Sequence, residues 1–88
     1  MTYEQHLKAA IEALKRADPS VSNRRLSLAA ELHPGWVSDF MATGAATMTR
    51  SSRVIRVIGE MCPEDDGGHE VRAILGMLSA PSTREDAA

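Results

Sequence analysis

The chain is poor in cysteine, in aromatic residues and in long apolar runs. Its 88 residues include one cysteine, Cys62, and one each of Phe, Tyr and Trp. A single cysteine excludes a small secreted fold held together by disulfide bonds. The scarcity of aromatic side chains means that any core must consist mainly of Leu, Ile, Val, Met and Ala. The length allows one small domain and excludes an α/β enzyme of ordinary size.

No stretch of about 18 apolar residues is present, so we expect no membrane-spanning helix. The first residues lack the basic and then apolar segments of a signal peptide, and we therefore expect a cytoplasmic protein. The three histidines and Cys62 show no metal-ligand spacing, and no serine lies in a nucleophile elbow. We expect no metal site, no cofactor and no enzymatic activity.

Charge is distributed unevenly along the chain, although the formal net charge is only −2. Residues 22–56 carry five arginines against two acidic residues, a formal charge of +3, whereas residues 57–88 carry −5. A basic middle segment beside an acidic end indicates a polyanionic partner for the middle of the chain. The arginines could also be solvated helix faces, which is the ordinary role of such clusters.

Apolar residues recur at helical spacing in five segments, and no alternating pattern typical of a strand is present. We therefore expect an all-α fold, a compact bundle of about five short helices in residues 1–80, followed by a disordered tail in residues 81–88. The expected helices run from Thr2 to Asp18, from Ser22 to about His33, from Pro34 to Gly44, from about Arg50 to Met61, and from about His69 to Ser79.

Local signals define several of these helix ends. Thr2 and Gln5 fit a capping box, and Ser22 is a suitable N-cap. Pro34 fits the first position of a helix, where its missing N–H is not needed. Gly44 fits a helix C-terminus, because glycine readily adopts the left-handed conformation.

The stretch NRRLSLAAELHPGWVSDFMATG, residues 23–44, places apolar side chains where two short helices joined by a turn would bury them. It resembles the helix-turn-helix of the phage repressor/Cro class, the XRE family, with the motif at about residues 22–44. The similarity extends into TRSSRVIRVIGEM and covers roughly residues 3–62. It implies a lambda-repressor-like domain that binds double-stranded DNA as a homodimer.

Two departures from the family pattern stand out. Glu31 occupies the turn position where the family usually has glycine, which leaves open a turn of different shape. The second helix of the motif lacks Arg, Lys, Gln and Asn, which make the commonest base contacts.

The resemblance implies two sets of DNA-contacting residues. In this class, the start of the second helix enters the major groove, and the flanking segments contact phosphates. The base-reading candidates are His33, Pro34, Gly35, Trp36, Ser38 and Asp39. The phosphate-contacting candidates are Ser22, Asn23, Arg24, Arg25, Thr47, Thr49, Arg50, Ser51 and Arg53. Trp36 could equally be exposed for binding or partly buried against the preceding helix.

We therefore expect a sequence-specific transcriptional regulator that acts by occupying an operator. Two alternatives remain: the antitoxin of a toxin–antitoxin pair, and a protein-binding adaptor that retains the helix-turn-helix scaffold without using DNA. The last expected helix could pair with its counterpart in a homodimer or pack on its own core. Its acidic character would also suit contact with another regulatory protein.

Overall fold

The computed structural model describes residues 2–87, and the side chains of residues 2–78. Over this range the chain forms five α-helices and one short 3-10 helix, without a strand. The elements are α1 (Tyr3–Ala17), α2 (Asn23–Ala29), α3 (Trp36–Thr43), α4 (Met48–Met61), η1 (Asp66–Gly68) and α5 (His69–Ala87). The expected all-α fold of about five short helices is confirmed.

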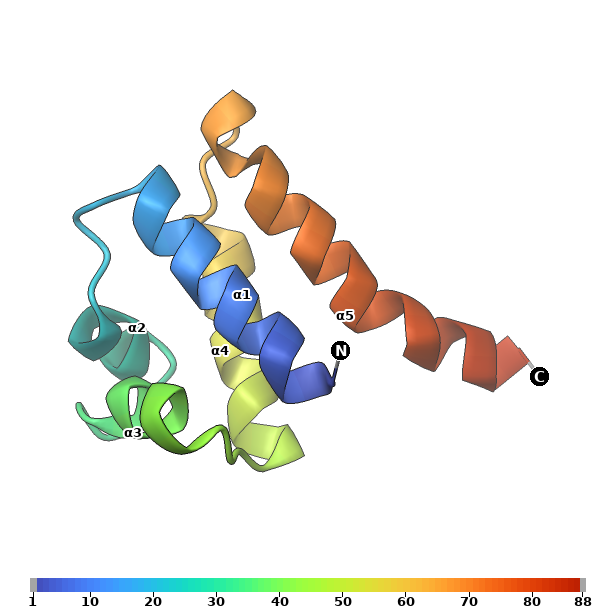
Figure 1. Cartoon of the computed structure of the whole chain (residues 1–88), viewed down its shortest axis with the longest axis horizontal. Helices are drawn as coiled ribbons and strands as arrows, with labels where there is room; N and C mark the ends of the chain where they lie inside the picture. Colours follow the sequence, from blue (N-terminus) through green and yellow to red (C-terminus); the bar gives the residue numbers. More distant parts are fainter. Residues whose placement is uncertain (1, 88) are drawn as a thin grey trace.

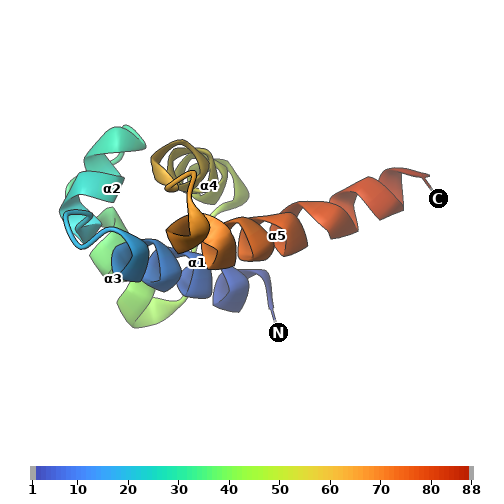
Figure 2. The same cartoon turned by 90° about the horizontal axis from the view of Figure 1, so that it is seen from above.

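The helix α1 is the centre of the arrangement, and it packs against both α4 and α5 (Figure 1). The short helices α2 and α3 pack against each other at one end of the molecule, and α2 also contacts α4. The turn containing η1 lies at the opposite end (Figure 1). Figure 2 shows that α5 runs beside α1 and then extends beyond the other helices. No helix of the described residues is both long and apolar enough to cross a membrane.

The core is aliphatic, as the composition predicts. Leu7, Ile11 and Leu14 of α1 are fully buried, and Phe40 of α3 is 1% exposed. The other buried apolar residues come from all five α-helices and from the segment that follows α1: Ala10, Ala13, Val21, Leu26, Ala30, Val37, Val54, Val57, Ile58, Val71 and Ile74. Burial of these side chains fixes α2, α3 and α4 relative to α1.

Several helix ends agree with the sequence signals. Thr2 and Gln5 form the capping box of α1, and Ser22 accepts a hydrogen bond from the backbone N–H of Arg25. Gly44 ends α3 in the left-handed conformation, with φ of 75°. These ends depend on residues within a few positions of one another, which is why the sequence predicts them.

Three other boundaries were predicted wrongly. The helix α2 ends at Ala29, well before His33, because the chain reverses at Glu31. The helix α3 begins at Trp36, and Pro34 lies in the turn before it. The helix α4 begins at Met48, because Thr47 caps it and accepts a hydrogen bond from the backbone N–H of Arg50.

The helix α5 continues to Ala87, past the predicted end near Ser79. Proline removes one backbone hydrogen bond from a helix and bends it, but the residues after Pro81 can still adopt helical dihedral angles. The side chains of residues 79–88 lie outside the described part of the chain, and the disorder expected for residues 81–88 stays a prediction.

Candidate nucleic-acid interface

Ser27 joins α2 to the beginning of α3. Its hydroxyl donates to the backbone carbonyl of Asn23, at 2.8 Å, and accepts from the backbone N–H of Val37, at 2.9 Å. The first N–H groups of a helix need acceptors from outside the helix. Gly35, the N-cap of α3, has no side chain to supply one. The fully buried Ser27 therefore caps α3 from the neighbouring helix and fixes the relative position of the two helices.

The turn after α2 is a Schellman motif. The backbone N–H of Leu32 donates to the carbonyl of Ser27, at 2.9 Å, and that of Glu31 donates to the carbonyl of Leu28, at 3.0 Å. Glu31 has φ of 62°, the left-handed conformation that glycine adopts most easily. The turn therefore has the backbone conformation that glycine favours, although glutamate occupies this position.

The remainder of the turn places two exposed residues in front of α3. The Nδ1 atom of His33 accepts from the backbone N–H of Gly35, at 3.2 Å, and the His33 carbonyl accepts from the N–H of Trp36, at 3.0 Å. His33 and Pro34 are exposed. Both residues therefore lie in the turn before α3, whereas the sequence predicted Pro34 at the first position of the helix.

Trp36 packs against Phe40 of its own helix. Its ring stacks on that of Phe40, with a centroid separation of 5.6 Å and an interplanar angle of 10°. Trp36 is half-buried and contacts the core cluster, so only part of the ring is available at the surface. Ser38 and Asp39, which follow it in α3, are exposed.

Asn23 bridges three helices. Its Oδ1 accepts from the Lys15 ammonium on α1, at 3.0 Å, and its Nδ2 donates to the Ser38 hydroxyl on α3, at 3.3 Å. The sequence places Asn23 among the phosphate contacts. In the structure, the side-chain amide of Asn23 is instead hydrogen-bonded within the protein, next to the exposed face of α3.

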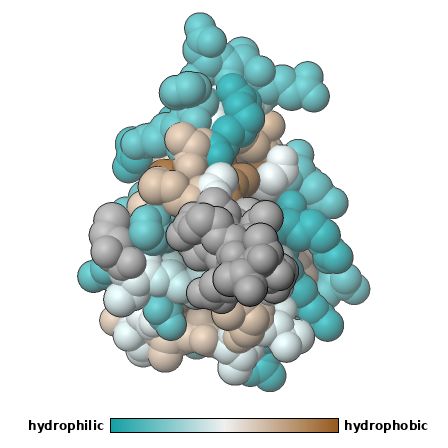
Figure 3. Space-filling view, turned by 90° about the vertical axis from the view of Figure 1, so that its right-hand side faces the viewer, coloured by the Kyte–Doolittle hydropathy of each residue, from teal (hydrophilic) through white to brown (hydrophobic). Residues whose placement is uncertain are grey.

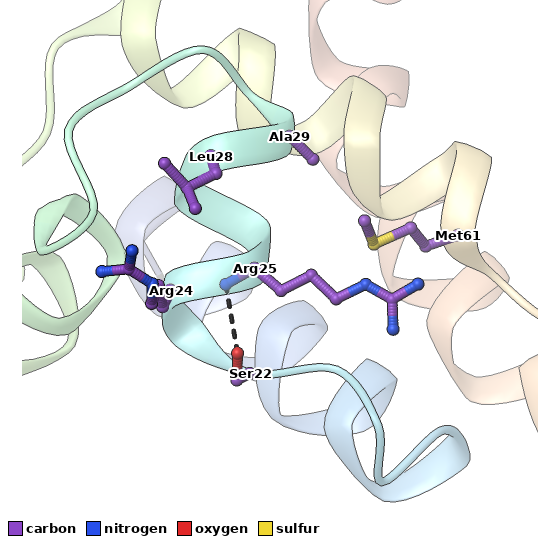
Figure 4. A pocket seen from close by; sticks show the side chains of 6 residues that line it. All are labelled: Ser22, Arg24, Arg25, Leu28, Ala29 and Met61. Atoms are coloured by element: carbon purple, nitrogen blue, oxygen red, sulfur yellow. Dashed lines mark hydrogen bonds between the residues drawn. The ribbon is translucent and has the colours of Figure 1, made fainter.

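The basic residues at the start of α2 differ in how they are held. The Arg25 guanidinium donates to the hydroxyl and the carbonyl of Ser20, at 3.0 and 3.5 Å. Arg24 is exposed, and Figure 4 shows its side chain pointing away from that of Arg25. The Ser22 hydroxyl is used to cap α2. Arg24 is therefore the most available of these residues for an external anion.

The start of α4 gathers the second group of phosphate candidates. Thr47, Thr49, Arg50 and Arg53 line a surface hollow of about 460 Å³. Ser51 is an exception and corrects the sequence prediction. It is fully buried, and its hydroxyl is hydrogen-bonded to the Tyr3 hydroxyl, at 2.9 Å, and to the Met48 carbonyl, at 3.1 Å. Ser51 therefore joins α4 to α1 and is not available to a ligand.

The described acidic residues around η1 and the beginning of α5 lie away from α3: Glu64, Asp65, Asp66 and Glu70. In Figure 3, hydrophilic residues gather at the top of the molecule, where Figure 1 places η1 and the beginning of α5. Among the described residues, the one ion pair joins Arg16 to Glu70 at this end, at 2.8 Å. The arginines near α3 thus have no carboxylate partner in the described part of the chain. The same part contains no cluster of residues that could hold a metal ion.

A second hollow, of about 480 Å³, lies between α2 and the end of α4 (Figure 4). Ser22, Arg24, Arg25, Leu28, Ala29 and Met61 line it. Leu28 is 48% exposed. This hollow was not predicted from the sequence, although the position of Leu28 off the buried face formed by Leu26 and Ala30 is a signal of an exposed apolar side chain.

No family model matches the chain, and the comparisons with curated proteins and with solved structures found no match. The function must therefore be argued from the arrangement of α2, α3 and the beginning of α4.

Proposed function

We propose that the protein is a sequence-specific regulator that binds double-stranded DNA, with α2 and α3 acting as a helix-turn-helix. The observation that carries this proposal is the cap that Ser27 provides to α3, at 2.9 Å, while Ser38 and Asp39 of that helix remain exposed. A helix held in this way can enter the major groove as a rigid unit. Ser38 and Asp39 would then face the base edges.

The positions of the free arginines support the same proposal. Arg24 lies on α2, and Arg50 and Arg53 line the hollow at the beginning of α4, so arginines precede and follow α3 along the chain. Both segments lie at the end of the molecule that contains α3 (Figure 1). Contacts of this kind to phosphates fix the register of a protein on DNA and provide much of the affinity.

The proposed regulator would act as a homodimer that occupies its operator. One small module buries too little surface for strong specific binding, and a dimer reads two half-sites. Met77 on α5 is 49% exposed, on the helix that extends beyond the others (Figure 2). This exposed apolar side chain supports α5 as the contact between two copies.

A salt titration of duplex binding tests the proposal. Log affinity should fall steeply with log salt, and Arg53→Ala should lessen the slope by about one unit. Arg16→Ala is the matched control, because Arg16 pairs with Glu70 at the acidic end. This control should leave the slope unchanged. Binding that does not depend on salt would contradict the proposal.

The hollow between α2 and α4 favours a second candidate, a protein-binding adaptor. Exposed Leu28 and the half-buried Met61 provide an apolar surface beside Arg24 and Arg25. An adaptor would shift no duplex at low salt and would copurify with a protein partner. Leu28→Ala would weaken that copurification without changing the charge beside Arg24, and any DNA binding should be retained.

A further inference from the structure

Three polar side chains form a hydrogen-bonded chain that ends on the exposed face of α3. The Lys15 ammonium donates to Oδ1 of Asn23, at 3.0 Å, and Nδ2 of Asn23 donates to Oγ of Ser38, at 3.3 Å. Lys15 and Asn23 are half-buried, whereas Ser38 is exposed. The hydrogen-bonded series therefore runs from half-buried Lys15 on α1, through Asn23 on α2, to the surface proposed to meet DNA.

The Lys15 ammonium determines the direction of both hydrogen bonds. An ammonium group can only donate, so Oδ1 of Asn23 must be the atom that faces Lys15. Its amide hydrogens then face Ser38, and the Ser38 oxygen must act as the acceptor. No group of the described residues takes the Ser38 hydroxyl hydrogen in return. That hydrogen and one of the two lone pairs of the oxygen remain available outside the protein, and the hydrogen points away from Asn23.

We propose that Asn23 is a positioning residue that occupies one lone pair of the Ser38 hydroxyl and directs its hydrogen outward, so that α3 prefers a base offering an acceptor in the major groove. The acceptors of this kind are N7 of a purine, O6 of guanine and O4 of thymine. This inference rests on the proposed DNA-binding function. It adds the direction of one hydrogen bond to a base. The residue type alone leaves this direction open, because a serine hydroxyl can donate or accept.

Asn23→Asp tests the direction of the hydrogen bonds that join Lys15, Asn23 and Ser38. A carboxylate at this position can only accept, so it would take hydrogen bonds from both Lys15 and the Ser38 hydroxyl. Ser38 would then offer its lone pairs to the groove. We expect the preferred base at that one position to change to one with an amino group, N6 of adenine or N4 of cytosine, by about threefold to tenfold in relative affinity.

The measurement is selection of bound sequences from a random duplex pool by the full chain and by each variant. Arg24→Gln is the matched control, because it changes the charge by the same amount on the same helix without touching the hydrogen-bonded chain. It should lower the affinity for all sequences equally. Ser38→Ala should remove the preference at that position and retain it elsewhere. Circular dichroism and thermal unfolding show whether each variant is folded.

Modified bases provide a second test, in which the main comparison uses the unmodified protein. The selected duplex is prepared with an analogue that weakens one acceptor at a time: 7-deazapurines, 6-thioguanine or 4-thiothymine. The unmodified protein should lose about threefold to tenfold in affinity for one of them, and Ser38→Ala should lose nothing further.

The outcomes separate this inference from the function on which it rests. If the unmodified protein selects no sequence, the proposed function fails. If it selects a sequence, but Asn23→Asp is folded and keeps the same preferred base at every position, the role of Asn23 is overturned. Equal affinity for every analogue would overturn the role of Ser38 as a donor.

Discussion

The hydroxyl of Ser27 on α2 accepts a hydrogen bond from the backbone N–H of Val37 on α3, at 2.9 Å, and both residues are fully buried. Ser27→Ala would leave that N–H without an acceptor, which costs about 1–3 kcal/mol of stability. Urea unfolding measures the change. The exposed Ser52→Ala provides the control, which should stay within about 0.5 kcal/mol of the unmodified protein. Equal stability of the two variants would show that Ser27 is not a cap of α3.

Glu31→Gly should stabilise the protein. Glu31 adopts a left-handed conformation, which costs a residue with a side chain about 1–2 kcal/mol. Glycine also loses more backbone entropy on folding, so the net gain should be about 1 kcal/mol at most. Thermal unfolding measures it. Glu31→Ala removes the same carboxylate and keeps the side-chain penalty, so it should give no comparable gain; an equal gain from both would attribute the effect to charge.

Ser51→Ala should change the stability of the protein, whereas Arg50→Ala should change the salt dependence of its DNA binding. Ser51 is buried and bonded to Tyr3, and its removal should lower stability by about 1 kcal/mol without changing the salt dependence of DNA binding. Arg50 is exposed in the hollow at the beginning of α4, so its removal should lessen the salt slope by about one unit with little effect on stability. A reduced slope for folded Ser51→Ala would contradict the structural role given to Ser51.

Features that depend on nearby residues were predicted from the sequence, and features that depend on distant residues were not. The caps at Thr2, Ser22 and Gly44 depend on local residues, and the structure agrees with all three. Burial of Ser51 depends on Tyr3, a residue 48 positions away, which no local pattern indicates. The engagement of Asn23 likewise depends on Lys15 in another helix.

The position of the turn between α2 and α3 was predicted from the sequence, but the end of α2 was not. Pro34 and Gly35 marked a turn between two helices, but the left-handed residue that follows α2 is Glu31 rather than a glycine. Because Leu32 fits the apolar spacing of α2, the pattern extended that helix too far. The Schellman hydrogen bonds and the buried Ala30 impose a conformation that intrinsic propensity disfavours.

Asp18 should make stability depend on pH in the acid range. The backbone N–H and the hydroxyl of Ser20 donate to its carboxylate, which lowers the pKa of Asp18 below its ordinary value of 3.8. The unfolded chain binds the proton more readily, so this contribution is present above the unfolded pKa and is lost as the pH falls through the folded pKa. Asp18→Asn should flatten the stability profile below about pH 4. An unchanged profile would mean that the Ser20 contacts do not persist in solution.

Selection of bound duplexes from a random pool, repeated at two salt concentrations, tests whether α3 reads DNA. A dimeric helix-turn-helix should enrich two related half-sites, spaced by about 10–10.5 base pairs or a multiple of that distance, with weaker binding at higher salt. Ser38→Ala should lose the preference at one position of each half-site. Failure to enrich any sequence at low salt, with a protein shown to be folded, would contradict a DNA-binding role for α3.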